Sequence, residues 1–278
     1  ILGQDRVYHS ISIHPQDNHR WSYTDPPLAT LPPDLRDIYE PDPGWPWFGW
    51  DWKGIELRII AAEAKSRYLL EALSKDYDVH TMTACDIWGW AYPPCLVDPV
   101  HASENAGWLL DHNWRLCDHD KERCGSDDPR RVFGKRFRFR RNYGGKAKYA
   151  TGIPGARALG LTGTMLTRAA HNMDRQDPDM ASWWLRMTVE VNKTGTVYDW
   201  DGAMRRLFEE DQQRRARQGF DFPMQSGTQS KANKVFIKIK REFKDAVAYA
   251  YGMHDSQFWR VREDVWDEIT PRLREIAQ

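Results

Sequence analysis

The sequence predicts an α+β fold in which a small antiparallel sheet packs with several helices. A compact aromatic run at 45–50 indicates a buried strand. An apolar, aromatic segment at 247–253, a tight turn at 254–256 and a second apolar segment at 257–261 indicate a hairpin. Most of the chain between these strands has helical patterns, so we expect the sheet to be assembled from segments far apart in the sequence.

In chain order, the segment 14–46 is rich in Pro, Asp and Trp, which predicts irregular structure or short strands. The strand at 45–50 would place Asp51 at its end. Helices are expected at 55–65 and 78–90, where good helix formers recur. The segment 91–129 has little periodicity and is interpreted as an irregular insertion to which no role is assigned.

The segment 130–148 contains nine basic residues and no acidic one. A run of charge is usually a solvated face. Here, however, Arg131, Lys135, Phe139 and Tyr143 recur every four residues, which on an α-helix gives one stripe about 18 Å long. Gly144-Gly145 is expected to end this helix.

The remaining elements complete the α+β pattern. Residues 156–190 are predicted to be mostly helical, and 195–200 to form a short strand. Two separate charged helices are expected at 203–218 and 228–244, and a closing helix at 263–277. There is no internal repeat.

Length and composition set broad limits. A chain of 278 residues forms one large domain or two modest ones. The 40 basic and 40 acidic residues give zero net charge, which does not exclude a nucleic-acid partner, because the arrangement of charge matters more than its sum. No signal peptide or long apolar run is found, so we expect an intracellular protein, neither secreted nor bound to a membrane.

The four cysteines are Cys85, Cys95, Cys117 and Cys124. Their spacing, with His119 between the last two, fits no common zinc motif, so ordinary reduced residues are favoured over a structural metal site.

Two aspartates, Asp51 and Asp255, each follow an apolar, aromatic strand. Either one alone is most simply a turn former. Together they suit two hard divalent cations, as used in phosphoryl transfer. On the basic helix, Arg131 and Lys135 are suited to a triphosphate, and Phe139 and Tyr143 to a base or sugar. The combination favours nucleotidyl transfer over hydrolysis.

Six segments, in order, resemble the family A DNA polymerases, the family of bacterial DNA polymerase I and its phage-type relatives. Residues 51–58 (DWKGIELR) resemble motif A, residues 131–144 motif B, and residues 253–256 (MHDS) motif C. Three further segments resemble other elements of the family: 78–81 (DVHT), 222–226 (FPMQS) and 20–32, which includes Asp25-Pro26-Pro27-Leu28.

The resemblance implies the right-hand polymerase fold: an antiparallel palm sheet with packed helices, and a mostly helical fingers subdomain. The expected division is 1–79 for the N-terminal palm, 80–195 for the fingers with the insertion at 91–129, and 196–278 for the C-terminal palm. No thumb is evident, and the chain is expected to be an excerpt or a minimal enzyme.

It also implies residue roles. Asp51, Asp255 and the Trp52 backbone carbonyl would bind two Mg²⁺ ions, or Mn²⁺ in their place. Arg131, Lys135 and His80 would contact the triphosphate. Glu56, together with Phe139 and Tyr143, would form a steric gate that excludes a ribose 2′-hydroxyl. The minor groove of the primer–template would be contacted by Arg20, Gln225 and His254. The implied partners are primer–template DNA, deoxynucleoside triphosphates, and a thumb segment or processivity factor supplied from elsewhere. The implied location is the cytoplasm of a bacterial or phage-infected cell, or an organelle.

Three departures leave alternatives open. Ser256 stands where the DNA polymerases have Glu, and is typical of single-subunit RNA polymerases. Glu56 opposes the RNA polymerase alternative, because those enzymes keep that position small. The glycine expected before Arg20 is replaced, and Asp221 stands where Asn is usual, which weakens the expected duplex contacts. A polymerase-derived protein that binds nucleic acid without catalysis is the second alternative.

Overall fold

The computed structural model describes residues 10–12, 20–24, 40–89, 129–253 and 255–278. Cys95, Cys117, Cys124, His254, residues 25–28 and nearly all of the insertion predicted at 91–129 lie outside these ranges. The chain divides into two compact units. We call residues 1–59, 197–206 and 222–278 the sheet unit, and residues 60–196 and 207–221 the helical unit.

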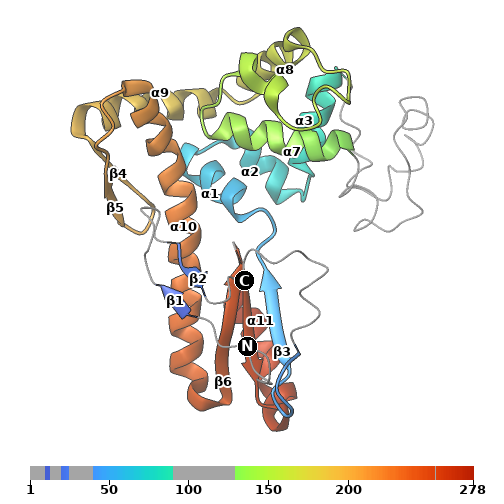
Figure 1. The fold of residues 1–278 in the computed structure, drawn as a ribbon, viewed down its shortest axis with the longest axis vertical. Helices are drawn as coiled ribbons and strands as arrows, with labels where there is room; N and C mark the ends of the chain where they lie inside the picture. Colours follow the sequence, from blue (N-terminus) through green and yellow to red (C-terminus); the bar gives the residue numbers. More distant parts are fainter. Residues whose placement is uncertain (1–9, 13–19, 25–39, 90–128, 254) are drawn as a thin grey trace, which may run out of the picture. The chain divides into compact units, whose positions relative to one another are not determined.

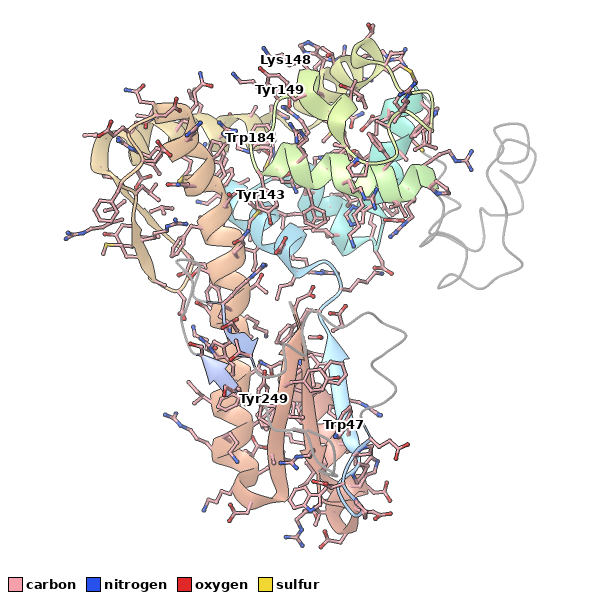
Figure 2. All side chains as sticks on the ribbon, viewed as in Figure 1. Trp47, Tyr143, Lys148, Tyr149, Trp184 and Tyr249 are labelled. Carbon is pink, nitrogen blue, oxygen red and sulfur yellow. The ribbon has the colours of Figure 1, made fainter. Side chains whose placement is uncertain are left out.

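The sheet unit contains a three-stranded antiparallel sheet in the order β3-β7-β6. Its strands are β3 (Trp47–Asp51), β6 (Val247–Met253) and β7 (Ser256–Val261). The predicted strands are confirmed, with a register shift between Tyr249 and Tyr251. Figure 1 shows β3 and β6, and Figure 2 labels Trp47 on the first and Tyr249 on the second.

The two faces of this sheet differ. Phe48 and Trp259, which are paired across β3 and β7, are buried in an apolar cluster with Val235, Ile239 and Leu273. The opposite face carries Phe258, whose ring stacks on Tyr251 at 4.6 Å. A Cβ at Gly49 would lie 2.6 Å from that Phe258 ring, so only glycine fits there. The side chains that alternate with Phe48, including exposed Asp51, lie on this second face.

Helices cover the first face. α10 (Gln212–Phe243) contributes Val235 and Ile239 to the cluster, and α11 (Trp266–Ala277) contributes Ile269, Leu273 and Ile276. The short 3₁₀ helices η5 (Lys244–Ala246) and η6 (Glu263–Val265) precede β6 and α11. Two further antiparallel pairs are β1 (Ser10–Ser12) with β2 (Ser22–Thr24), and β4 (Thr196–Tyr198) with β5 (Met204–Arg206).

The helical unit is built from α2 (Arg67–Ser74), α3 (Val79–Trp88), α7 (Pro129–Asn142), η4 (Ala147–Gly152), α8 (Gly163–Gln176) and α9 (Pro178–Thr194). α1 (Ile55–Ala64) begins in the sheet unit and continues into the helical unit. Phe133 and Phe137 of α7 form the core with Ile87 of α3 and Leu166 of α8.

α3 and α7 approach closely at Gly134. A Cβ on Gly134 would lie 2.5 Å from the His80 carbonyl oxygen and 3.0 Å from the Ala84 nitrogen. Gly144, with φ of +71°, and Gly145 then end α7 as predicted: the Gly145 N–H donates to Arg140 O at 2.7 Å, and the Gly144 N–H to Arg141 O at 2.8 Å.

The two helices predicted at 203–218 and 228–244 are wrong in their bounds. Residues 203–211 are not helical, because Asp199 accepts the N–H groups of Asp201 and Ala203 and turns the chain into the β4–β5 hairpin. The predicted break before 228 is also absent, since α10 is continuous from 212 to 243. The short helix α2 was not predicted.

Candidate active site

The ends of β3 and β7 bring Asp51 and Asp255 together. Asp51 is paired with Ser256 in the antiparallel ladder, and the Trp52 N–H donates to Asp255 O at 3.4 Å. The two side chains are hydrogen-bonded to each other. Aspartates separated by more than two hundred positions in the sequence therefore meet at one edge of the sheet.

This pair is electrostatically unfavourable when both groups are ionised. Burial raises the pKa of Asp255 to about 6, with further contributions from the Asp51 charge, the hydrogen bond with Asp51, and Glu56. Because neighbouring carboxylates resist ionising together, a cation between them would relieve the repulsion. The donor set is all oxygen, which suits Mg²⁺ or Mn²⁺.

The backbone beside the pair is held firmly. The Trp52 indole N–H donates to Ala277 O at 2.6 Å, and the Trp52 carbonyl accepts from the Ile55 N–H at 3.3 Å. Gly54 takes φ of +60° in this turn, which favours glycine. Among the described residues no group of three or more His, Cys, Asp or Glu side chains is arranged to hold a metal. The oxygen atoms that the structure describes at this edge of the sheet include those of the two aspartates and the Trp52 carbonyl.

Glu56, in the first turn of α1, is half-buried and pairs with Arg20, with 2.6 Å between Arg20 Nη2 and Glu56 Oε1. Sequence reasoning had expected Glu56 to line a sugar pocket and Arg20 to contact DNA, and did not anticipate their pairing. Phe139 and Tyr143 belong to the helical unit, so the structure describes them separately from Glu56.

In the helical unit, Arg131 forms a two-point ion pair with Asp78: Nε lies 2.5 Å from Oδ2 and Nη2 lies 3.3 Å from Oδ1. Asp78 is also the N-cap of α3, accepting from the His80 N–H at 3.1 Å and from the Thr81 hydroxyl at 2.7 Å. Burial alone would raise the pKa of Asp78, but Arg131 and Thr81 outweigh it and hold the pKa below its usual value.

The rest of the motif B stripe lies along α7. Lys135 is exposed. The Phe139 ring lies 5.7 Å from that of His80 and 6.4 Å from that of Tyr143. Tyr143, labelled in Figure 2, follows the last residue of α7. Two cations and a row of rings therefore share one side of the α3–α7 pair.

His80 is mostly buried. Burial, with the charges of Arg131, Lys135 and Arg138, lowers the pKa of His80 to about 4, and Asp78 opposes this shift. At neutral pH the imidazole is therefore uncharged, and a neutral imidazole binds phosphate only as a hydrogen-bond donor.

The last predicted contact, Gln225, lies half-buried on α10. The next residue, Ser226, donates to Asp199 at 2.7 Å, and Ser230 donates to the same carboxylate at 3.0 Å. A Cβ at Gly227 would lie 2.7 Å from the Trp200 ring. The 222–226 segment is thus fixed against the β4–β5 hairpin.

Sequence reasoning missed two carboxylates that hold the predicted site segments in place, Asp78 and Asp199. Asp78 received no role, although an Asp one residue before a helical pattern is an N-cap signal. Asp199 was taken as part of a strand, although the spacing of Asp199, Asp201 and Gly202 is typical of a turn.

Comparison with known proteins agrees with these motifs. No protein-family model matches the chain. DNA polymerase I of Bacillus subtilis is 38% identical over 76 residues, which is 25% of this chain and 9% of that protein. DNA polymerase I of Geobacillus stearothermophilus is 37% identical over 103 residues, 32% of this chain and 12% of that protein. Over these segments the chain is similar to DNA polymerase I. The resemblance to the family A polymerases is thereby confirmed.

Broader matches point the same way. The DNA polymerase of Mycobacterium phage D29 is 23% identical over 198 residues, 70% of this chain. The matched segments span only 9% to 26% of the length of these three proteins, the two bacterial polymerases and the phage polymerase. Among solved structures, the POL domain of Pol1 from M. smegmatis, in complex with DNA primer-template and dNTP, matches with a TM-score of 0.75 and 17% identity, covering 98% of this chain and 44% of that one. That match shows a shared polymerase-domain fold.

A membrane-spanning segment was not found: of the helices that the structure describes, none is both long and apolar enough to cross a bilayer.

Proposed function

We propose that this chain is the core of a template-directed DNA polymerase, which transfers a nucleotide from a deoxynucleoside triphosphate to a primer 3′-hydroxyl. The observation that carries the proposal is the contact between Asp51 and Asp255 at the end of adjacent antiparallel strands. The relationship to DNA polymerase I supports it.

In this reaction the primer 3′-hydroxyl loses its proton to water and its oxygen bonds to the α-phosphorus. The bond from that phosphorus to the bridging oxygen breaks, and pyrophosphate leaves with the electron pair. Asp51, Asp255 and the Trp52 carbonyl would hold Mg²⁺, which when bound lowers the pKa of the attacking hydroxyl and offsets charge on the leaving group. Lys135 and Arg131 would bind the triphosphate through charge-assisted hydrogen bonds, and neutral His80 would donate one more. Phe139 and Tyr143 would contact the base or sugar.

The test is primer extension with Mg²⁺. Asp51→Ala or Asp255→Ala should abolish extension, because each removes an oxygen ligand, while affinity for primer–template stays near the unsubstituted value, since that affinity depends mostly on phosphate contacts. Ser74→Ala, an exposed position in the helical unit, is the control.

Loss of DNA binding together with extension would indicate a folding defect. No extension by the unsubstituted chain, with DNA binding intact, would favour a non-catalytic nucleic-acid-binding protein. Equal use of ribonucleotides would favour the single-subunit RNA polymerase alternative.

A further inference from the structure

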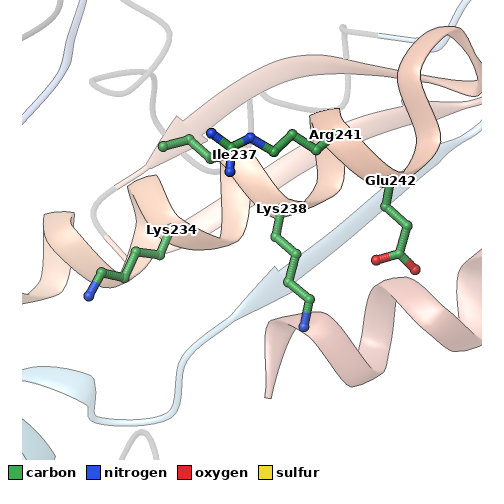
Figure 3. A pocket seen from close by; sticks show the side chains of 5 residues that line it. All are labelled: Lys234, Ile237, Lys238, Arg241 and Glu242. Carbon is green, nitrogen blue, oxygen red and sulfur yellow. The ribbon is translucent and has the colours of Figure 1, made fainter.

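The outward face of α10 carries a basic surface that the proposed reaction does not use. Lys234, Ile237, Lys238, Arg241 and Glu242 line a shallow hollow of about 550 Å³. All five side chains are exposed, and Figure 3 shows Lys234, Lys238 and Arg241 extending from successive turns of α10. From Lys234 to Arg241 the helix rises about 10 Å.

This face points away from the sheet. Val235 and Ile239, on the other side of α10, are buried against Trp259 and Val247. Asp51 lies on the opposite face of the same sheet, beyond those residues. Within the sheet unit, a ligand on the basic face of α10 is therefore separated from the carboxylate pair by a helix and a sheet.

The charge of this face is only partly balanced. Lys234 is held by Asp201 at 2.5 Å and lies 4.4 Å from the Trp200 ring centre, and Glu242 is paired with Arg272 at 2.7 Å. Among the described residues, Lys238 and Arg241 form no ion pair or side-chain hydrogen bond, although the charge of Lys238 contributes to lowering the pKa of Glu275. Between 231 and 245 there are six basic residues and two acidic ones.

The chemistry of the face favours a phosphate backbone over a protein. Protein interfaces have an apolar, often aromatic centre depleted of charge, whereas Ile237 is the single apolar residue lining this hollow. Rows of Lys and Arg on one face of a helix are the electrostatic signature of nucleic-acid binding.

We infer that the outward face of α10, through Lys238 and Arg241, binds the phosphodiester backbone of duplex DNA at a place separate from the carboxylate pair. The contact is independent of sequence and does not need catalysis, so it extends the proposed function without resting on it.

The experiment measures binding of the whole chain to a blunt duplex with no recessed 3′ end over a range of salt concentrations. Lys238→Gln/Arg241→Gln should lower the affinity and reduce the slope of log K against log[salt] by about 2, because each phosphate contact contributes about 0.9. Arg262→Gln/Arg274→Gln removes the same charge from exposed positions of the sheet unit outside the α10 face and should leave the slope near its original value. Lys238→Arg keeps the charge and should also keep the original slope.

Four results would overturn the inference. An unchanged slope means that the face is only solvated. An equal loss in the control pair means long-range attraction without contact. If poly-glutamate binds as tightly as the duplex and loses the same affinity in Lys238→Gln/Arg241→Gln, the partner is an acidic protein. If Lys238→Gln/Arg241→Gln lowers primer extension at saturating primer–template as much as it lowers duplex affinity, the residues belong to the catalytic groove. A chain without polymerase activity still gives the duplex readout, so failure of the proposed function is recognised separately.

Discussion

At the scale of residues, the α7 stripe distinguishes the residues proposed to bind phosphate from other exposed charges. Lys135 and Arg136 are adjacent and both exposed, but Arg136 donates to Pro154 O at 2.9 Å and lies off the stripe. If Lys135 binds the triphosphate, Lys135→Ala should lower kcat/KM for a deoxynucleotide by about 10- to 100-fold, which corresponds to a charge-assisted contact worth about 1.5–3 kcal/mol. Steady-state incorporation kinetics measure this, with Arg136→Ala as the control. Equal losses would identify a general DNA-binding surface instead.

Arg131 differs from Lys135 because it is already paired with Asp78. Arg131→Ala should therefore lower both incorporation and the stability of the helical unit, since it leaves the Asp78 carboxylate partly buried without its partner. Asp78→Asn retains a good N-cap for α3 while weakening the ion pair. The sequence could predict that Arg131 matters, but it could not predict this pair, because the two residues are 53 positions apart.

His80 should make stability depend on pH. Its pKa is about 4 in the folded chain and ordinarily 6.5. As pH falls from about 6.5 to 4, the unfolded chain binds a proton that the folded chain does not, so the free energy of unfolding decreases. His80→Gln should lose less stability over this window than the unsubstituted chain, as measured by urea unfolding at each pH. Parallel curves for the two proteins would contradict the burial argument.

At the scale of elements, the contact between α3 and α7 depends on Gly134. A methyl group there would lie 2.5 Å from the His80 carbonyl oxygen, so Gly134→Ala should force the helices apart and destabilise the chain by about 1–3 kcal/mol. Chemical denaturation measures the change. Gly152→Ala is the matched control, because a Cβ there meets no atom within 4 Å. Similar changes in stability for both variants would show that the loss of glycine flexibility, and not the contact between the helices, causes the effect.

Glycine also explains where prediction from sequence failed. Separate helices were predicted at 203–218 and 228–244, yet α10 runs without a break through Gly219, Pro223 and Gly227. A Cβ at Gly219 would meet Val191 at 2.8 Å, and one at Gly227 would meet the Trp200 ring at 2.7 Å. These glycines permit close packing by residues distant in sequence, which local propensity cannot register. The strands of the sheet were predictable because apolar and aromatic periodicity is a local signal.

At the scale of the whole molecule, the proposed residues are shared between the two units. Asp51, Asp255 and Glu56 belong to the sheet unit, and Arg131, Lys135, Phe139 and Tyr143 to the helical unit. Motif order in the sequence was therefore more informative than any single element, because it associates residues that no helix or strand connects. Their joint action is a matter for experiment.

Sugar selection offers that experiment. The resemblance assigns exclusion of the ribose 2′-hydroxyl to Glu56 together with Phe139 and Tyr143. Glu56→Ala should then raise ribonucleotide use relative to deoxyribonucleotide use by at least about tenfold in kcat/KM, or about 1.4 kcal/mol. Arg20→Ala is the control, because it breaks the Arg20–Glu56 ion pair while leaving the Glu56 carboxylate in the chain. Selection by Glu56 predicts little change in sugar preference for that variant.

A double-mutant cycle tests whether the two units act together. Tyr143→Phe removes the hydroxyl of a residue to which the resemblance assigns sugar selection together with Glu56. If the two groups select the sugar jointly, the effects of Glu56→Ala and Tyr143→Phe on sugar preference should be non-additive by more than about 0.5 kcal/mol. Groups that act jointly do not contribute independently. Additive effects would mean that each residue acts alone. An unsubstituted chain that already incorporates both sugars equally would end the gate hypothesis, and Ser256, the departure shared with RNA polymerases, would then be the residue to substitute first.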